Sequence, residues 1–125
     1  MTENTHTIKV LIIDDDKDIL EALEVALSME GFDVRTASSS KQGFKEITQR
    51  RPDVILLDVL LSGEDGRVVM KKLKEKEETK SIPVIMISAH PTAQHSSLEA
   101  GANAFLAKPF VMEDLLHTIT DYARG

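Results

Sequence analysis

Short apolar runs alternate along the chain with longer stretches in which apolar residues recur every three or four positions. The runs predict buried strands at residues 8–13, 32–37, 53–58, 84–87 and 104–107. The longer stretches predict amphipathic helices at residues 16–30, 40–50, 67–77, 92–100 and 112–123. Residues 62–66 are expected to form a loop. Asp16 fits the N-cap of the first helix, and Gly31 fits the position after its end.

Strict alternation of strands and helices favours an α/β fold, in which a parallel sheet carries helices on both faces. The strands support this class, because the uninterrupted apolar run of residues 54–57 is typical of a strand that is buried on both faces. Right-handed crossovers leave few possible topologies. We therefore predict a (βα)5 doubly wound, five-stranded parallel sheet of the flavodoxin-like type, with strand order 2-1-3-4-5.

Length, charge and composition narrow the class of protein. The chain has 125 residues, the size of one domain, with residues 1–7 expected as a flexible N-terminal tail and residues 8–125 as the folded domain. The net charge of −6 disfavours direct binding to nucleic acid or to a membrane surface. The absence of cysteine excludes disulfides and thiolate chemistry. Neither a signal peptide nor a membrane-length apolar stretch is visible, so we expect a cytoplasmic location.

Polar residues with complementary chemistry stand at the ends of four predicted strands. Asp14, Asp15 and Asp16 follow the first strand, Asp58 ends the third, Ser88 follows the fourth and Lys108 follows the fifth. In a sheet of this order, ligands bind beyond the carboxyl ends of the strands, near the first and third. Neighbouring strands lie roughly 4.8 Å apart, so we expect these side chains to converge.

The convergence of these side chains fits a phosphoryl group on an aspartate. Clustered carboxylates repel one another, and a hard cation such as Mg²⁺, which prefers oxygen ligands and phosphate, relieves the repulsion. Lys108 can neutralise further negative charge, and the hydroxyl of Ser88 can donate to a phosphoryl oxygen. An aspartate that forms an acyl phosphate is an established nucleophile.

From about residue 9 to residue 122, the chain resembles the chemotaxis-regulator-like receiver domains of two-component response regulators. Four segments carry the resemblance in the same order and spacing. They are VLIIDDD at 10–16, LLD at 56–58 with two glycines downstream, PVIMISA at 83–89 and GANAFLAKPF at 101–110.

The resemblance implies a magnesium-dependent signalling switch rather than an enzyme acting on another substrate. Asp58 would accept a phosphoryl group from a histidine kinase or a phosphotransfer protein. Asp15, Asp58 and the backbone carbonyl of Leu60 would bind Mg²⁺, and Asp14 would support the ion indirectly. The domain would catalyse its own phosphorylation and a slow dephosphorylation.

The resemblance also implies how the phosphoryl group is detected. Lys108 and Ser88 would contact it, Phe105 would turn inward together with Ser88, and the Lys108–Pro109 peptide bond would be cis. The face of the fourth helix, fifth strand and fifth helix would then change. A downstream protein, an output domain or a second copy of the chain would bind this face.

Two features set this chain apart within the family. Ser62 stands where a proline is common, so we expect a less rigid loop there. Leu60 and His90 occupy variable rim positions that tune hydrolysis of the acyl phosphate, and Leu60 cannot orient a water molecule. We therefore expect slow self-dephosphorylation.

Several alternatives remain open from the sequence. Asp14-x-Asp16 resembles the nucleophile motif of haloacid-dehalogenase-like phosphatases, although Lys17 is atypical there. A flavodoxin-like FMN module shares the architecture, but three aspartates would repel the FMN phosphate. A receiver-like domain used only for docking would usually lack one of four side chains that this chain retains, Asp15, Asp58, Ser88 and Lys108. The aspartate run could also act only as a turn and helix cap, and Lys108 could be a solvated loop residue.

Overall fold

The computed structural model describes residues 7–124, and most of the predicted tail lies outside them. Its central sheet contains five strands: β1 (Lys9–Ile13), β2 (Asp33–Ala37), β3 (Val54–Asp58), β6 (Val84–Ser88) and β7 (Ala104–Ala107). All neighbouring pairs in this sheet are parallel, and their order is β2-β1-β3-β6-β7. Since β6 and β7 are its fourth and fifth strands in chain order, the predicted order 2-1-3-4-5 is confirmed.

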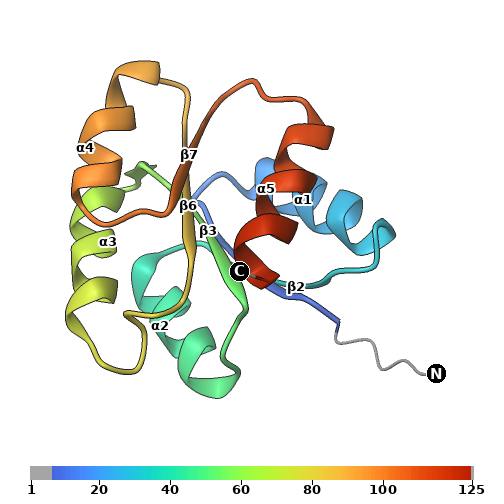
Figure 1. The fold of residues 1–125 in the computed structure, drawn as a ribbon, viewed down its shortest axis with the longest axis horizontal. Helices are drawn as coiled ribbons and strands as arrows, with labels where there is room; N and C mark the ends of the chain where they lie inside the picture. Colours follow the sequence, from blue (N-terminus) through green and yellow to red (C-terminus); the bar gives the residue numbers. More distant parts are fainter. Residues whose placement is uncertain (1–6, 125) are drawn as a thin grey trace.

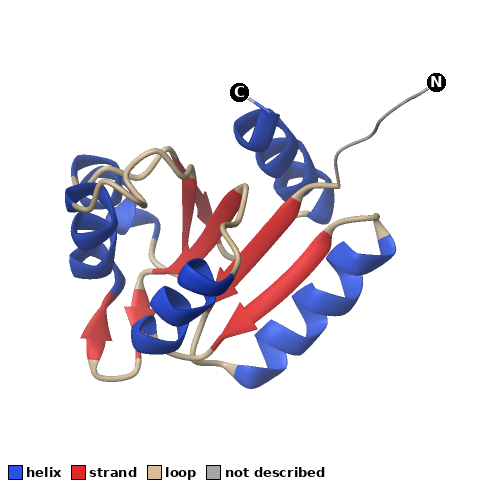
Figure 2. Cartoon of the chain, turned by 90° about the horizontal axis from the view of Figure 1, so that it is seen from below, coloured by secondary structure: helices blue, strands red, loops and turns tan. Residues whose placement is uncertain are grey.

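Helices cover both faces of this sheet (Figures 1 and 2). They are α1 (Lys17–Met29), α2 (Ser40–Gln49), α3 (Gly66–Glu75), α4 (Gln94–Glu99) and α5 (Met112–Arg124). In Figure 1, α1 and α5 lie on one side of the sheet, and α2, α3 and α4 lie on the other. The predicted doubly wound class is therefore confirmed.

Two hydrophobic cores separate on the two faces because successive side chains of a strand point in opposite directions. Leu56 joins the core beneath α1 and α5, whereas Ile55 and Leu57 join the core beneath α2, α3 and α4. Residues 54–57 are all fully buried. Burial of each such side chain contributes roughly 1.5–3 kcal/mol to folding, and the double coverage explains why the strands contain no polar alternation.

Local capping fixes where the first helix begins. The side chain of Asp16 accepts hydrogen bonds from the backbone N–H groups of Asp18 at 3.0 Å and Ile19 at 3.3 Å. This satisfies donors that have no partner within a helix. At the other end, Gly31 follows the C-cap residue Glu30. Both cap predictions are confirmed.

The predicted loop at residues 62–66 was wrong in part. The structure contains a small antiparallel hairpin there, formed by β4 (Leu60–Leu61) and β5 (Glu64–Asp65). Gly63, in the two-residue turn, has a φ of +74°, a conformation that L side chains rarely adopt. Strands of two residues are too short for any hydrophobic period to be recognised in the sequence.

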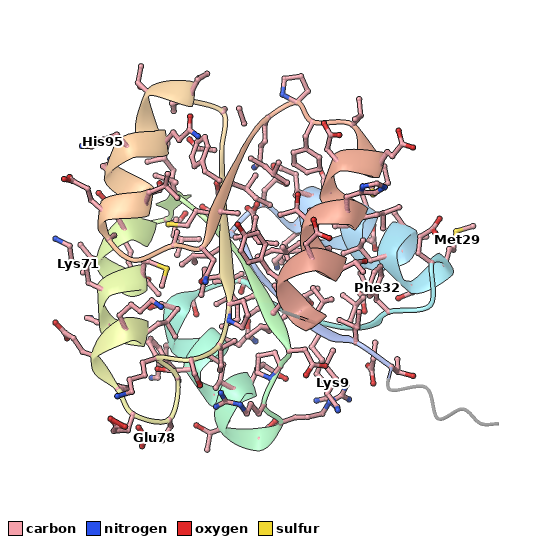
Figure 3. All side chains as sticks on the ribbon, in the orientation of Figure 1. Lys9, Met29, Phe32, Lys71, Glu78 and His95 are labelled. Atoms are coloured by element: carbon pink, nitrogen blue, oxygen red, sulfur yellow. The ribbon has the colours of Figure 1, made fainter. Side chains whose placement is uncertain are left out.

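The fourth and third helices also differ from the prediction in their bounds. The segment predicted at 92–100 begins with a 3-10 turn, η1 (Pro91–Ala93), and becomes α-helical only at α4. The third helix ends at Glu75 rather than at 77. Figure 3 shows Lys71 and His95 extending from α3 and α4 away from the sheet, and both are exposed.

Candidate functional site

The topology gathers the candidate side chains at one edge of the sheet. Asp14 directly follows β1, Asp58 is the last residue of β3, and Ser88 is the last residue of β6. Lys108 directly follows β7, and its backbone N–H donates to the carbonyl of Ser88 at 2.8 Å. All these strands are parallel, so their carboxyl ends meet at the crevice where ligands bind in this architecture.

Three carboxylates form the centre of this edge. Asp14, Asp15 and Asp58 each offer one oxygen atom, and these atoms lie within 4.8 Å of one another. The Asp14 residue is only 4% exposed. Oxygen atoms at this separation can share one hard cation such as Mg²⁺.

The Asp58 carboxylate is held in an environment that opposes its charge. Burial raises its pKa from the ordinary value of 3.8 to about 6, and the charge of Asp14 adds to the increase. The ammonium of Lys108 and a hydrogen bond from the Leu60 backbone N–H act in the opposite direction. The net effect is a carboxylate whose charged form gains from any additional positive charge.

Lys108 supplies the ammonium group of the site. Its Nζ atom lies 3.5 Å from Oδ2 of Asp14 and 3.8 Å from Oδ1 of Asp58. Among the described residues of this edge, the cluster of three carboxylates is accompanied by one ammonium, which contacts Asp14 and Asp58, so an excess of negative charge remains. The Lys108–Pro109 peptide bond is cis, as expected from the sequence.

Ser88 ends β6, the strand next to β3, and Phe105 lies on β7, the strand beyond it. Ser88 is only 1% exposed, and its Oγ accepts a hydrogen bond from the backbone N–H of His90 at 2.9 Å. Because the oxygen is the acceptor in that bond, the O–H hydrogen is available to donate. Phe105 pairs in register with Met86 and is partly buried against the core beneath α2, α3 and α4.

The β4–β5 hairpin closes the site on the side of α2. Ser62 Oγ donates to Oδ2 of Asp15 at 2.6 Å, so this loop is tied to the acidic cluster. We expected a less rigid loop because Ser62 stands where a proline is common in the family. That expectation did not take this hydrogen bond into account. Leu60 lies at the rim of the site and is 55% exposed.

Gly66 makes the close approach between the hairpin and β3 possible. A Cβ atom at this position would collide with the backbone carbonyl of Asp58 and crowd Val59. The Gly66 N–H donates to the Val59 carbonyl at 2.6 Å. A larger residue would push the hairpin away from β3.

An apolar cavity of about 520 Å³ adjoins the carboxylates on the side of α1. Its wall includes Ile19, Ala22 and Leu23 from α1 and Phe110 from the segment after β7. Asp14, Asp58 and Lys108 form its polar end. The charged edge is therefore continuous with an apolar recess.

The positions of Asp14 and Asp16 bear on the alternative of a haloacid-dehalogenase-like phosphatase, in which Asp14 would be the nucleophile. That alternative depends on Asp14 and Asp16 acting as a pair. Instead, the Asp16 side chain caps α1, and its backbone N–H donates to Oδ1 of Asp14 at 2.9 Å. Asp16 is thus a structural cap, and Asp58 is the carboxylate at the end of β3.

The fold and the site together define a doubly wound α/β domain with an acidic, lysine-containing edge. Residues 10–120 match the family model of the response regulator receiver domain. The chain belongs to the response regulator receiver domain family. Acceptance of a phosphoryl group followed by a change of conformation is the general role of this family, so the predicted family and function are confirmed at that level.

Curated relatives include longer regulators. The chain is 37% identical over 110 residues to the transcriptional regulatory protein PrrA of Mycobacterium tuberculosis, a match that covers 86% of this chain and 46% of that protein. It is 38% identical over 109 residues to the phosphate regulon transcriptional regulatory protein PhoB of Pseudomonas aeruginosa, covering 86% and 48%. The chain therefore spans about half the length of these relatives.

Solved structures share the fold closely. A putative response regulator from Chloroflexus aurantiacus superposes with a TM-score of 0.90 at 34% identity, covering 96% of this chain and 100% of that one. The chemotaxis protein CheY4 of Vibrio cholerae gives a TM-score of 0.86 at 28% identity, covering 94% and 99%. Within residues 7–124, no helix is both long and apolar enough to cross a membrane.

Proposed function

We propose that Asp58 is the phosphoacceptor of this domain and receives its phosphoryl group from a histidine kinase or a phosphotransfer protein. The observation that carries the proposal is the convergence of Asp14, Asp15 and Lys108 around Asp58. A carboxylate oxygen of Asp58 would attack phosphorus, the phosphorus–nitrogen bond of a phosphohistidine would break, and the imidazole would leave with the bonding electron pair. In this reaction the domain would catalyse its own phosphorylation.

The donor set fits Mg²⁺ as the cofactor. Asp15, Asp58 and the backbone carbonyl of Leu60 are the proposed ligands, and Asp14 is the proposed indirect partner. All of these donors are oxygen atoms, and the excess of carboxylates over ammonium groups favours a divalent cation. When bound, the ion supplies positive charge to the transferring group.

Lys108 and Ser88 complete the proposed contacts. The Lys108 ammonium, 3.8 Å from Asp58, is near enough to reach an oxygen of a phosphoryl group on that residue and stabilise its charge. The hydroxyl of Ser88 would donate to the same group, and Phe105 would move inward when the segment after β6 follows Ser88. The domain would thus shift between two conformations, because the charge of the phosphoryl group favours one of them over the other.

The signal would leave through the face of α4, β7 and α5. A downstream protein or an output domain is the proposed partner, since PrrA and PhoB are named transcriptional regulators and extend well beyond the matched region. A homodimer formed on phosphorylation is a further outcome of the same surface change. The proposed location is the cytoplasm, because the proposed histidine kinase would need ATP to phosphorylate itself.

Slow self-dephosphorylation belongs to the same proposal. The apolar side chain of Leu60 lies at the rim, where it has no group that can orient water toward a phosphoryl group on Asp58. The lifetime of the acyl phosphate, measured by intact mass after the donor is removed, is expected to be minutes or longer. A lifetime of seconds would contradict this part.

Incubation with acetyl phosphate and Mg²⁺, followed by intact mass measurement, tests the acceptor. Wild type should gain the mass of one phosphoryl group, and Asp58→Ala should gain none. Asp121→Ala, which alters an exposed aspartate on α5, is the matched control and should react like wild type. Chelation of Mg²⁺ should abolish the reaction, and phosphorylation of Asp58→Ala would refute the assignment.

A further inference from the structure

The three carboxylates of the acidic cluster differ in their hydrogen-bonding and ionic partners. Asp14 accepts from the backbone N–H of Asp16 and faces Lys108. Asp58 accepts from the backbone N–H of Leu60 and also faces Lys108. Among the described residues, Asp15 has neither a backbone donor nor the ammonium as a partner, and its side chain accepts a hydrogen bond from Ser62.

The bond between Ser62 and Asp15 has the length of a strong, charge-assisted hydrogen bond. The distance from Ser62 Oγ to Asp15 Oδ2 is 2.6 Å, within the range typical of a hydroxyl that donates to a carboxylate. The two residues are far apart in the chain, so the bond links the segment after β1 to the β4–β5 hairpin. It engages Oδ2 of Asp15, so Oδ1 is the oxygen of this carboxylate that Ser62 does not bind.

Ser62 stands on a supported piece of backbone. The hairpin pairs Leu60 with Asp65, and Ser40 Oγ donates to Oε2 of Glu64 at 2.7 Å. The same hairpin carries the Leu60 carbonyl. A hydroxyl fixed in this way can hold a carboxylate in one orientation at a low cost in conformational entropy.

We propose that Ser62 is a positioning residue that makes the cation site selective for Mg²⁺ over Ca²⁺. This inference rests on the proposed function, because it presupposes that Asp15 binds the ion. With Oδ2 held by Ser62, Asp15 offers a single oxygen. Mg²⁺ requires near-octahedral geometry with short bonds, whereas Ca²⁺ accepts bidentate carboxylates and irregular geometry.

Loss of the hydroxyl should therefore affect the two ions differently. In Ser62→Ala the Asp15 carboxylate can rotate and can present both oxygens. Removal of a partner that orients a metal ligand typically costs 10- to 100-fold in affinity. Because Ser62 is exposed, we expect the lower end for Mg²⁺, about 10-fold, with a smaller loss or none for Ca²⁺.

Calorimetric titration of the full chain with MgCl2 and with CaCl2 tests the inference without any phosphorylation. Ser62→Ala should raise the Kd for Mg²⁺ and lower the ratio of Ca²⁺ Kd to Mg²⁺ Kd. Ser62→Thr keeps a hydroxyl at the same position and should restore both values toward wild type. Ser81→Ala is the matched control, since it removes an exposed serine hydroxyl that accepts from Arg51 at 2.8 Å, outside the acidic edge.

The possible failures can be told apart. If Ser62→Ala binds Mg²⁺ as tightly as wild type, or loses affinity for both ions equally, the inference about Ser62 is overturned. If Asp15→Ala binds Mg²⁺ like wild type, the proposed metal ligands are wrong instead. Thermal unfolding of each variant in the presence of a chelator establishes that the proteins being compared are folded.

Discussion

At the scale of single residues, Asp58 combines burial with proximity to other carboxylates. Its side chain is 12% exposed, and its pKa is raised to about 6 mainly by burial. A raised pKa means that the ionised carboxylate disfavours the folded state relative to the unfolded chain. The residue proposed to react is thus one at which the fold gives up stability.

Asp58→Asn should therefore stabilise the protein at neutral pH in the absence of divalent cations. The folded protein binds the Asp58 proton more tightly, so the contribution of this group is complete below pH 3.8 and is lost as pH rises through about 6. Above that range, Asp58→Asn should unfold with a free energy higher by about 1–3 kcal/mol. Urea unfolding in EDTA between pH 5 and pH 8 measures the difference.

The control for this prediction is Asp121→Asn, which changes an exposed aspartate on α5. Its free energy of unfolding should follow wild type across the same pH range. The difference between Asp58→Asn and wild type should shrink as the pH falls below 6. A constant difference would mean that the gain arises from something other than the charge of Asp58.

The sequence predicted where part of this group of residues lies. Asp14, Asp58 and Lys108 could be anticipated because each stands at the end of an apolar run, and parallel strands place their ends together. The bond from Ser62 to Asp15 could not, because it depends on how a two-residue turn folds back. No periodic pattern encodes such a contact.

At the scale of elements, the β4–β5 hairpin joins the acidic edge to α4 through Arg67. The Arg67 guanidinium donates to Asp65 through Nε at 2.9 Å and Nη2 at 2.7 Å, and Nη1 donates to Ser96 Oγ at 2.8 Å. The hydrogen bond from Arg67 also lowers the pKa of Asp65. A side chain at the start of α3 thereby holds the short helix α4.

Arg67→Ala should loosen α4 while changing global stability little. The Arg67–Asp65 pair is substantially exposed, and such pairs contribute about 0–1 kcal/mol. The bond to Ser96 is lost as well, so amide hydrogens of α4 should exchange faster. Hydrogen exchange with peptide-level resolution measures this, and Lys71→Ala, an exposed change on α3, is the control. Unchanged exchange in α4 would show that Arg67 does not hold that helix.

Gly66→Ala adds a single methyl group but should destabilise the protein strongly. A Cβ at this position meets the Asp58 carbonyl and Val59, and neither backbone group can move away easily. Insertion of atoms into a packed site typically costs 1–3 kcal/mol. Denaturant unfolding should show a loss in this range, whereas Ser40→Ala, which removes only the bond to Glu64, should cost less. Equal stability of Gly66→Ala and wild type would show that the hairpin can move away from β3.

Elements were predicted best where the burial pattern is long. The four consecutive buried residues of β3 and the helical stripes of α1 and α5 carry enough positions for a period to be recognised. The hairpin and the 3-10 turn at residues 91–93 are short, and local geometry sets them. The prediction and the structure differ at these two elements and at the end of the third helix.

At the scale of the whole molecule, binding of a cation should stabilise the fold. A ligand that binds the folded state alone adds about 2.7 kcal/mol at a concentration of 100 times its Kd. We therefore expect a higher Tm in excess MgCl2 than in EDTA. Asp15→Ala should reduce the shift, and Asp18→Ala, an exposed change on α1, should retain it. An identical shift in Asp15→Ala would place the cation elsewhere.

The double burial of β3 has a mechanical consequence. Because residues 54–57 fill both cores, the strand cannot slide along its axis without exposing apolar surface on one side or breaking its register with β1 and β6. A chemical event at the last residue of β3 therefore leaves the strand in place as a stationary reference. Any movement of the backbone must then occur in the segments that follow the strand ends. A conformational change would therefore spread from one such segment to the next along this edge of the sheet, and not from one face of the sheet to the other.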